Sequence, residues 1–352
     1  MNKNRLLALA VVALPAGAFA SDVEIYGKLT GAIHSTRTTL AWQDQGTTTN
    51  IDSHDSYIGF KGNEDLGNGL KAIWQVEQAI AIDGSNRQNG WATRETFVGL
   101  SGAWGTVQAG YLDNFQRKYS RLDPHKAGNW TGMNFQLGVA RSLTSTELLV
   151  KNALAYTSPE WKGLTARVLY SADDEVRSPT NERQSQYEFG IRYAREGFYG
   201  QYAYTRRDRG IPSDERTHYV EAGYEANDWL AALTYMNYEQ RGDAYNDPDY
   251  GPQTFSLEKS RAIGVNIAHT FGRWTPHFQY QHIWQPSAFW RGAYSDTAGQ
   301  SYNQYILGVD YALSKRTELQ AAAGYVKSGN YAQYNKPYLK GHTVSLGLSH
   351  SF

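Results

Sequence analysis

The 352-residue sequence contains no cysteine, which excludes disulfide-stapled scaffolds and thiolate metal sites. Methionine and proline are scarce, with Met 3 and Pro 10 against Gly 34, Tyr 26 and Trp 10, and this bias favours strands and turns over helices. Neither charge sign is in excess, because 34 Lys+Arg face 34 Asp+Glu, so the basic surface that nucleic acid requires is missing. A mean hydropathy of −0.59 also excludes a bundle of apolar transmembrane helices.

Sequence motifs of enzymes and metal centres are missing too. The nine histidines include no pair at the i, i+4 spacing of a helical metal site, and His-Glu-x-x-His, Gly-x-Ser-x-Gly, Gly-x-Gly-x-x-Gly and phosphate-loop patterns do not occur. We therefore expect no enzymatic activity, no cofactor and no metal ion.

Residues 1–20 have the composition of a cleaved signal peptide. Lys3 and Arg5 precede an apolar run over residues 6–14, which is too short to span a bilayer. Ala18-Phe19-Ala20 fits the small-x-small rule for cleavage. We expect export by a secretory route, followed by a single domain over residues 21–352.

The rest of the chain alternates with a period of two. Val344, Leu346 and Leu348 alternate with small or polar residues, as expected for a strand with one apolar face. The same rhythm recurs upstream and gives about sixteen strands, in which short turns alternate with long connections. The long connections are expected at residues 36–54, 82–91, 112–134, 173–185, 207–214, 239–258, 286–299 and 327–340. An open sheet of this size would expose its edges, and closure into a barrel removes them.

A barrel of about sixteen strands is too wide for side chains to fill. We therefore expect an all-β, transmembrane antiparallel barrel with an apolar exterior, a wet interior, long extracellular loops and short periplasmic turns. Aromatic residues near strand ends fit the interfacial girdles of such barrels. The alternative is that they are core aromatics of a large soluble β protein. They are Trp74, Trp91, Trp104, Trp161, Tyr193, Tyr224, Trp229, Trp274 and Phe352.

Several stretches resemble the Gram-negative general porins, especially the branch common in β-proteobacteria. They are Ile25–Leu29, Gly59–Leu70, Phe97–Gly102, Trp104–Val107 and Ser351–Phe352. The resemblance implies a homotrimer of sixteen-stranded barrels in the outer membrane, in contact with its lipid and lipopolysaccharide. Each barrel would hold a water-filled channel for passive diffusion of ions and small hydrophilic solutes, narrowed by an inward-folded third loop. It also implies that Phe352 is read by the outer-membrane assembly machinery, although this ring fits a girdle or trimer-packing role as well.

We expect the constriction loop at residues 112–134, the longest connection after the fifth strand. Its charges are four basic and two acidic side chains, with a histidine beside them. They are Asp113, Arg117, Lys118, Arg121, Asp123 and Lys126. This composition predicts a constriction richer in positive than in negative charge.

The family pattern places a basic cluster on the wall that faces this loop. Lys28 and Arg94 match it, Arg141 matches it loosely, and Tyr57 stands at a further basic position, so we expect Lys61 to supply that charge. Arg167, Glu188 and Arg192 are also expected in the lumen, because a lysine or arginine at the lipid midplane costs about 2–4 kcal/mol. The charges predict a weak anion preference, unless the loop cations pair with acids such as Asp113, Asp123 and Glu77 and leave no selectivity.

Three other functions stay open at the level of sequence. Phe115, Tyr119 and Trp130 would suit a stacking surface for one small organic solute, or would simply anchor the loop. Carboxylates at lumen positions would suit a barrel hydrolase, or would act as counter-charges. The long loops are also compatible with adhesion.

Overall fold

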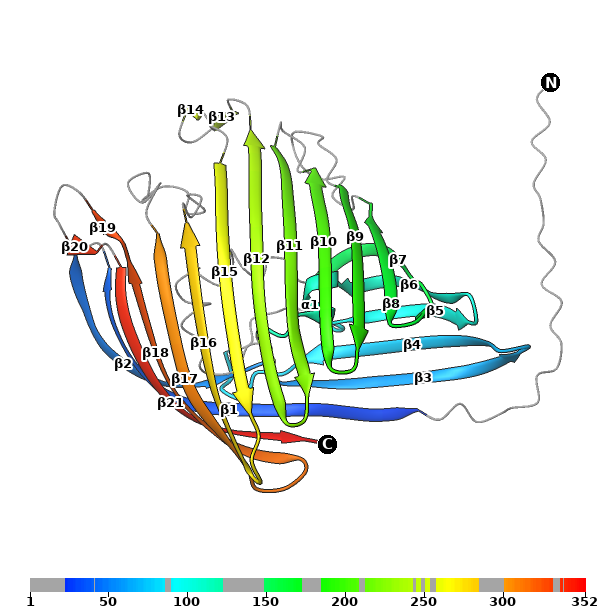
Figure 1. Ribbon diagram of the computed structural model, residues 1–352, viewed down its shortest axis with the longest axis horizontal. Helices are drawn as coiled ribbons and strands as arrows, with labels where there is room; N and C mark the ends of the chain where they lie inside the picture. Colours follow the sequence, from blue (N-terminus) through cyan, green and yellow to red (C-terminus); the bar gives the residue numbers. More distant parts are fainter. Residues whose placement is uncertain are drawn as a thin grey trace.

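The computed structural model describes most of the chain in one sheet system (Figure 1). The described residues are 23–40, 42–85, 90–122, 149–172, 185–208, 213–242, 245–247, 251–253, 258–284, 301–331, 336–337 and 339–352. The predicted signal peptide at residues 1–20 lies outside them. Among the described residues, no helix has the length and the hydropathy needed to cross a membrane.

The described elements are almost entirely strands, as the glycine-rich and aromatic-rich composition predicts. Their bounds are β1 Glu24–Leu40, β2 Gln43–Ser53, β3 Tyr57–Gly67, β4 Leu70–Ala79, β5 Thr96–Gly102, β6 Gly105–Asp113, α1 Phe115–Tyr119, β7 Leu149–Thr157, β8 Leu164–Ser171, β9 Ser185–Arg195, β10 Phe198–Asp208, β11 Ser213–Ala226, β12 Trp229–Gly242, β13 Tyr245–Asp247, β14 Gly251–Gln253, β15 Glu258–His269, β16 Trp274–Trp284, β17 Tyr302–Ala312, β18 Thr317–Ser328, β19 Asn330–Tyr331, β20 Lys336–Pro337 and β21 Leu339–Ser351.

The main sheet closes on itself at the first strand. One edge of β1 pairs antiparallel with β21 from Lys28↔Ser351 to Leu40↔Leu339. The other edge pairs with β3 near its start and with β2 further along, so β2 and β3 together fill one place in the ring. The sheet of 17 strands therefore forms a closed antiparallel barrel with sixteen places, which confirms the predicted fold class.

The two faces of the barrel wall have opposite polarity. On β21, Val344, Leu346 and Leu348 are exposed on the outside, while Thr343 and Ser349 are buried on the inside. The outward side chains form an apolar surface and the inward ones are mostly polar, because alternate residues of a strand point to opposite faces. This is the arrangement expected when hydrocarbon lies outside the barrel and water inside it.

Short turns and exposed aromatic rings share one rim of the barrel. At the turn between β3 and β4, Asn68 and Gly69 both take positive φ values, 53° and 76°, which glycine and asparagine adopt most readily. Six of the predicted girdle aromatics are exposed beside such turns or beside the chain end: Trp104, Trp161, Tyr193, Trp229, Trp274 and Phe352. Their position fits an interfacial girdle.

The long connection expected over residues 36–54 is wrong. β1 continues to Leu40 and β2 begins at Gln43, and the two strands pair from Gly31↔Ser53 to Leu40↔Gln43. The threonines in this stretch are β-branched and suit a strand. Because they are polar on both faces, however, the stretch lacks the apolar/polar alternation that identifies the other strands.

We predict that the exterior of the barrel rejects charge and that its interior tolerates it. Leu346→Arg places a cation on the outward face of β21 and should lower the free energy of unfolding in lipid vesicles by about 2–4 kcal/mol. Ser345→Arg is the matched control, because Ser345 precedes Leu346 on β21 and its side chain points into the barrel. Denaturant unfolding in vesicles measures both values, and equal losses for the two variants would contradict the assignment of the faces.

Candidate functional site

A short helix begins the long loop that follows β6. β6 includes Leu112 and ends at Asp113, so the loop begins at Asn114 and not at Leu112 as predicted. The Asn114 side chain caps the five-residue helix α1 by accepting a hydrogen bond from the Arg117 backbone N–H at 2.8 Å, as N-cap residues do. Asp113 and Arg117 form an ion pair at 2.7 Å, which ties the first turn to the strand end.

The ring of Phe115 fixes this helix against the inner barrel wall. It lies over Gly190 of β9, where a Cβ atom would come within 2.0 Å of the ring, so only glycine leaves room for the contact. Phe115 is buried with Ala203 and Tyr219 of the neighbouring strands. Its backbone N–H donates to Glu188 Oε1 at 2.7 Å. Phe115 therefore anchors the loop and offers no stacking surface to a solute.

A single carboxylate holds the chain just after the helix. Glu221 of β11 is fully buried and accepts hydrogen bonds from Ser120 Oγ at 2.8 Å and from the Arg121 backbone N–H at 2.8 Å. Within the wall it also accepts from the side chains of Tyr199 at 3.0 Å, Gln201 at 3.1 Å and Tyr219. Five donors thus stabilise the ionised carboxylate away from water.

The loop continues across the wall as far as the described residues extend. Leu122 packs over Gly264 of β15 and joins the largest apolar cluster inside the barrel, beside Met236 and Ile283. The Asn266 side chain donates to the Arg121 carbonyl at 2.8 Å. Residues 114–122 therefore lie along the inner face from β9 to β15, and Figure 1 shows α1 inside the ring.

The predicted basic wall lies on the first strands and alternates with aromatic rings. Arg94 stacks on Tyr57, with the guanidinium carbon 4.5 Å from the ring centroid. Lys61 Nζ lies 4.7 Å from the centroid of Tyr26, and the two tyrosine rings are 6.0 Å apart. Lys28 faces Tyr57 in the register of β1 and β3, so the structure brings these three cations together around two tyrosines.

Carboxylates neutralise much of this wall. Arg94 forms ion pairs with Asp55 and, at 3.3 Å, with Glu77. The Tyr26 hydroxyl also donates to Glu77 at 2.9 Å, and Lys61 pairs with Glu24 at 3.1 Å. The sequence pattern does not reveal Asp55, because it sits in the irregular residues between β2 and β3.

The remaining predicted lumen charges differ widely in exposure. Arg167 is buried and donates to the Asp113 carbonyl at 2.8 Å, with Glu188 3.6 Å away. Arg192 donates to Gln201 at 2.7 Å and stacks on Tyr199. Of the loop cations, Arg121 pairs with Glu225 at 2.7 Å, and Lys118 is partly exposed. Asp123, Lys126, Trp130 and Arg141 lie outside the described residues.

One acid beside the loop was missed by the sequence analysis. Glu95, just before β5, accepts a hydrogen bond from the Asp113 backbone N–H at 3.3 Å. Burial raises the pKa of the Glu95 carboxyl, and the nearby Asp113 carboxylate raises it further. Only the fold brings these two acids together, since 18 residues separate them in the chain.

These groups form two facing sides of one lumen. In the strand order, β1, β3 and β4 stand about half the ring away from β9, β10 and β11, so the basic wall faces the wall that carries the loop. A solute that moves along the barrel axis passes between them, and charge and width at this level control its passage.

Comparisons with known proteins agree with this geometry. A family model described as Gram-negative porin matches residues 6–331. The chain is 32% identical to the major outer membrane protein P.IB of Neisseria meningitidis serogroup B, over 93% of this chain and 94% of that protein. It is 30% identical to the P.IB protein of Neisseria gonorrhoeae over 94% and 95% of the two chains. Among solved structures, an anion-selective porin from Comamonas acidovorans superposes with a TM-score of 0.73 at 19% identity, over 94% of this chain and all of that one.

We predict that Glu221 keeps the loop docked. Glu221→Gln preserves the shape but removes the charge and places an amide N–H₂ among hydrogen-bond donors, and each bond to a charged group contributes about 1.5–3 kcal/mol. The loop should then leave the wall more often, which single-channel recording in planar bilayers detects as frequent changes between conductance levels.

Glu318→Gln is the control for this experiment. Glu318 is another lumen carboxylate, on β18, and it accepts a hydrogen bond from Gln320 on its own strand at 2.8 Å. A current from Glu221→Gln as steady as that from Glu318→Gln would show that the carboxylate does not hold the loop.

Proposed function

The chain belongs to the Gram-negative porin family, and we propose that its channel has a weak preference for anions. The family and the closed barrel identify the protein as a general outer-membrane porin and not as an enzyme. A porin replaces the cost of placing an ion in hydrocarbon by passage through water, so the charges along the channel decide which ions pass more readily.

Two cations on opposite walls carry the proposal. Lys28 on β1 and Arg192 on β9 occupy lumen positions and are partly exposed, and neither forms an ion pair within the described part of the chain. Within the described residues, each therefore presents to the channel a positive charge that has no acidic partner. At about 7 Å in water a unit charge contributes about 0.6 kcal/mol, roughly a threefold change in local ion concentration.

The acids of the lumen reduce the anion preference created by these two cations only in part. Glu77, Glu188 and Glu221 are buried and lie against cations or backbone donors, so an ion in the channel meets them indirectly. Exposed acids accompany two exposed cations, as in the pairs Lys61–Glu24 and Arg121–Glu225. Glu318 is a further, partly exposed lumen acid, so the balance favours anions only weakly.

The solved porin from Comamonas acidovorans is described as anion-selective. At 19% identity this likeness concerns the fold alone, so the proposal depends on the charges of this chain. The burial of Phe115 argues against the alternative of a solute-specific channel with a stacking surface on this loop.

We also propose that the protein assembles as a homotrimer surrounded by outer-membrane lipid and lipopolysaccharide, and that Phe352 is the signal for the assembly machinery. Membership of the porin family supports the trimer. Phe352 exchanges two backbone hydrogen bonds with Gly27, both at 3.1 Å. Its ring packs over Gly27, and the residue as a whole is 41% exposed. The backbone of Phe352 therefore helps to close the barrel, and the exposed part of its side chain is available for recognition.

A salt-gradient measurement tests the selectivity. Arg192→Gln and Lys28→Gln should each shift the reversal potential in a planar bilayer toward cations, corresponding to a change of about threefold or less in the permeability ratio. Lys315→Gln, at an exposed turn, is the control and should leave the potential unchanged. Clear cation selectivity of the unaltered channel would refute the proposal.

A second experiment separates assembly from packing. The unheated protein should migrate on a gel as a trimer that heat converts to monomer, and Phe352→Ala should reduce the amount of this trimer in cell outer membranes. Refolded in detergent, the same variant should still form trimers. Failure to form them there would assign Phe352 to packing, and a monomeric wild type would refute the trimer.

A further inference from the structure

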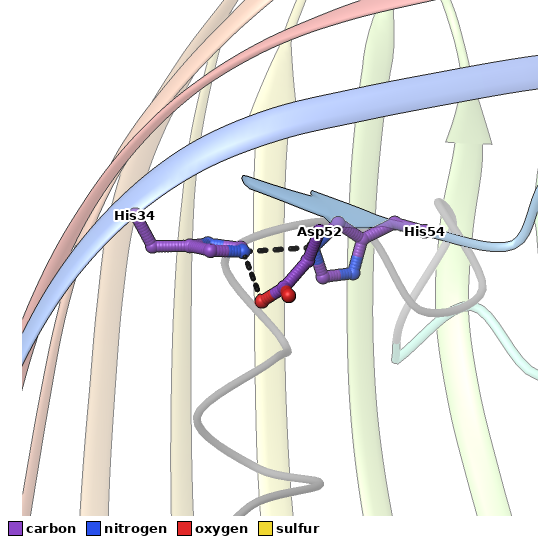
Figure 2. Close-up of side chains that lie close together, drawn as sticks. All are labelled: His34, Asp52 and His54. Atoms are coloured by element: carbon purple, nitrogen blue, oxygen red, sulfur yellow. Dashed lines mark hydrogen bonds and ion pairs between the residues drawn. The ribbon is translucent and has the colours of Figure 1, made fainter. Parts of the chain in front are cut away.

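Two histidines and one aspartate meet on the inner wall beside the basic wall (Figure 2). His34 Nε2 lies 2.7 Å from Asp52 Oδ2 and 3.1 Å from His54 Nε2. The three ligand-type atoms all lie within 4.8 Å of one another. The imidazole rings stand edge to face at 84°, with centroids 4.9 Å apart, so their Nε2 atoms converge on one point.

The strand register and the interruption of the second strand bring the three side chains together. His34 pairs with Asn50 and Ala32 pairs with Asp52 across β1 and β2, so His34 and Asp52 share the inner face. β2 then stops, and His54 lies in the three residues before β3. Its backbone N–H donates to the Thr30 carbonyl at 2.9 Å, which holds the ring over β1.

Hydrogen bonds alone do not readily satisfy all three of these atoms at once. If one N–H of His34 serves Asp52, the facing nitrogen of His54 shares the same proton or places a second donor against it. A metal ion satisfies all three atoms at once. In a tetrahedral zinc site, bonds of 2.0–2.2 Å put neighbouring ligand atoms about 3.3 Å apart, close to the 3.1 Å between the two nitrogens.

We propose that His34, Asp52 and His54 form a binding site for a divalent transition-metal ion, with zinc as the best-fitting occupant. Imidazole and carboxylate ligands suit zinc, and the three side chains leave a fourth position for water. His34 is buried, whereas the Asp52 side chain is 28% exposed, so ions enter from the lumen. Asn50 Nδ2 lies 3.4 Å from Asp52 Oδ2 and steadies the carboxylate from outside the ligand set.

No sequence pattern indicates this site, which explains the expectation that no metal ion is bound. His34 and His54 are 20 residues apart and lack any helical or finger-type spacing. Their meeting depends on a hairpin that the sequence pattern assigned to a loop.

Zinc at this point would act on the neighbouring basic wall. With neutral imidazoles the cluster carries one negative charge, and a divalent ion changes this to one positive charge. Asp55, which follows His54 directly, forms the ion pair with Arg94. Bound zinc would therefore fix the link between β2 and β3 and add positive charge beside Arg94.

Calorimetric titration of zinc chloride into the detergent-purified full chain tests the site without any transport measurement. We expect one zinc ion per chain. His34→Gln and His54→Gln should each weaken binding by roughly tenfold or more, since even residues outside the ligand set change metal affinity by 10–100-fold. His350→Gln is the matched control, because it removes an exposed histidine bonded to Thr317.

A heat-dependent change in gel migration shows that each variant is folded, and the titration then decides the proposal. Loss of binding in both cluster variants but not in His350→Gln supports the site. Absence of zinc binding to the folded wild type, or equal binding by all variants, overturns it and leaves the cluster as a hydrogen-bonded network.

Discussion

An unpaired backbone amide or carbonyl in hydrocarbon costs several kcal/mol, and this penalty shapes the whole chain. β1 satisfies it by carrying partners on both edges, with β21 on one side and β2 and β3 on the other. The first and last strands must therefore meet, which explains why Phe352 bonds to Gly27 at the start of the chain. Once the ring is closed, a period of two is enough to separate an apolar exterior from a polar interior.

Closure of sixteen places leaves an interior that wall side chains cannot fill. The loop after β6 occupies part of it, and because no continuous core surrounds the loop, a few specific contacts must hold it. Gly190 leaves room for the ring of Phe115 to pack on the wall. The buried carboxylate of Glu221 accepts hydrogen bonds from five donors. A charge is useful here because bonds to an ionised acceptor are stronger than neutral ones.

The sequence was sufficient for the barrel but not for the charge pattern inside it. The period of two, the short turns and the aromatic positions predict strands, faces and rims, since each depends on neighbours in the chain. The pairing of Arg94 with Asp55 and of Arg121 with Glu225 depends on which residues, distant in the sequence, the fold brings side by side. The hairpin of β1 and β2 was missed because polar threonines mask its alternation, and the His34–His54 contact was missed with it.

Exposure, more than the number of charges, governs what an ion meets in this lumen. Counted along the sequence, the loop is basic, but its Arg117 and Arg121 are paired with acids. On the barrel wall, Arg167 of β8 is buried. Among the described lumen cations, Lys28 and Arg192 have no ion-pair partner in the described part of the chain, and they lie on opposite sides of the lumen. A divalent ion at His34, Asp52 and His54 would add a third positive centre beside the first of these walls. The irregular residues between β2 and β3 lie where these two strands share one edge of β1. The same short segment supplies Asp55 to Arg94 and His54 to the proposed metal ligands, so it also affects the charge along the channel.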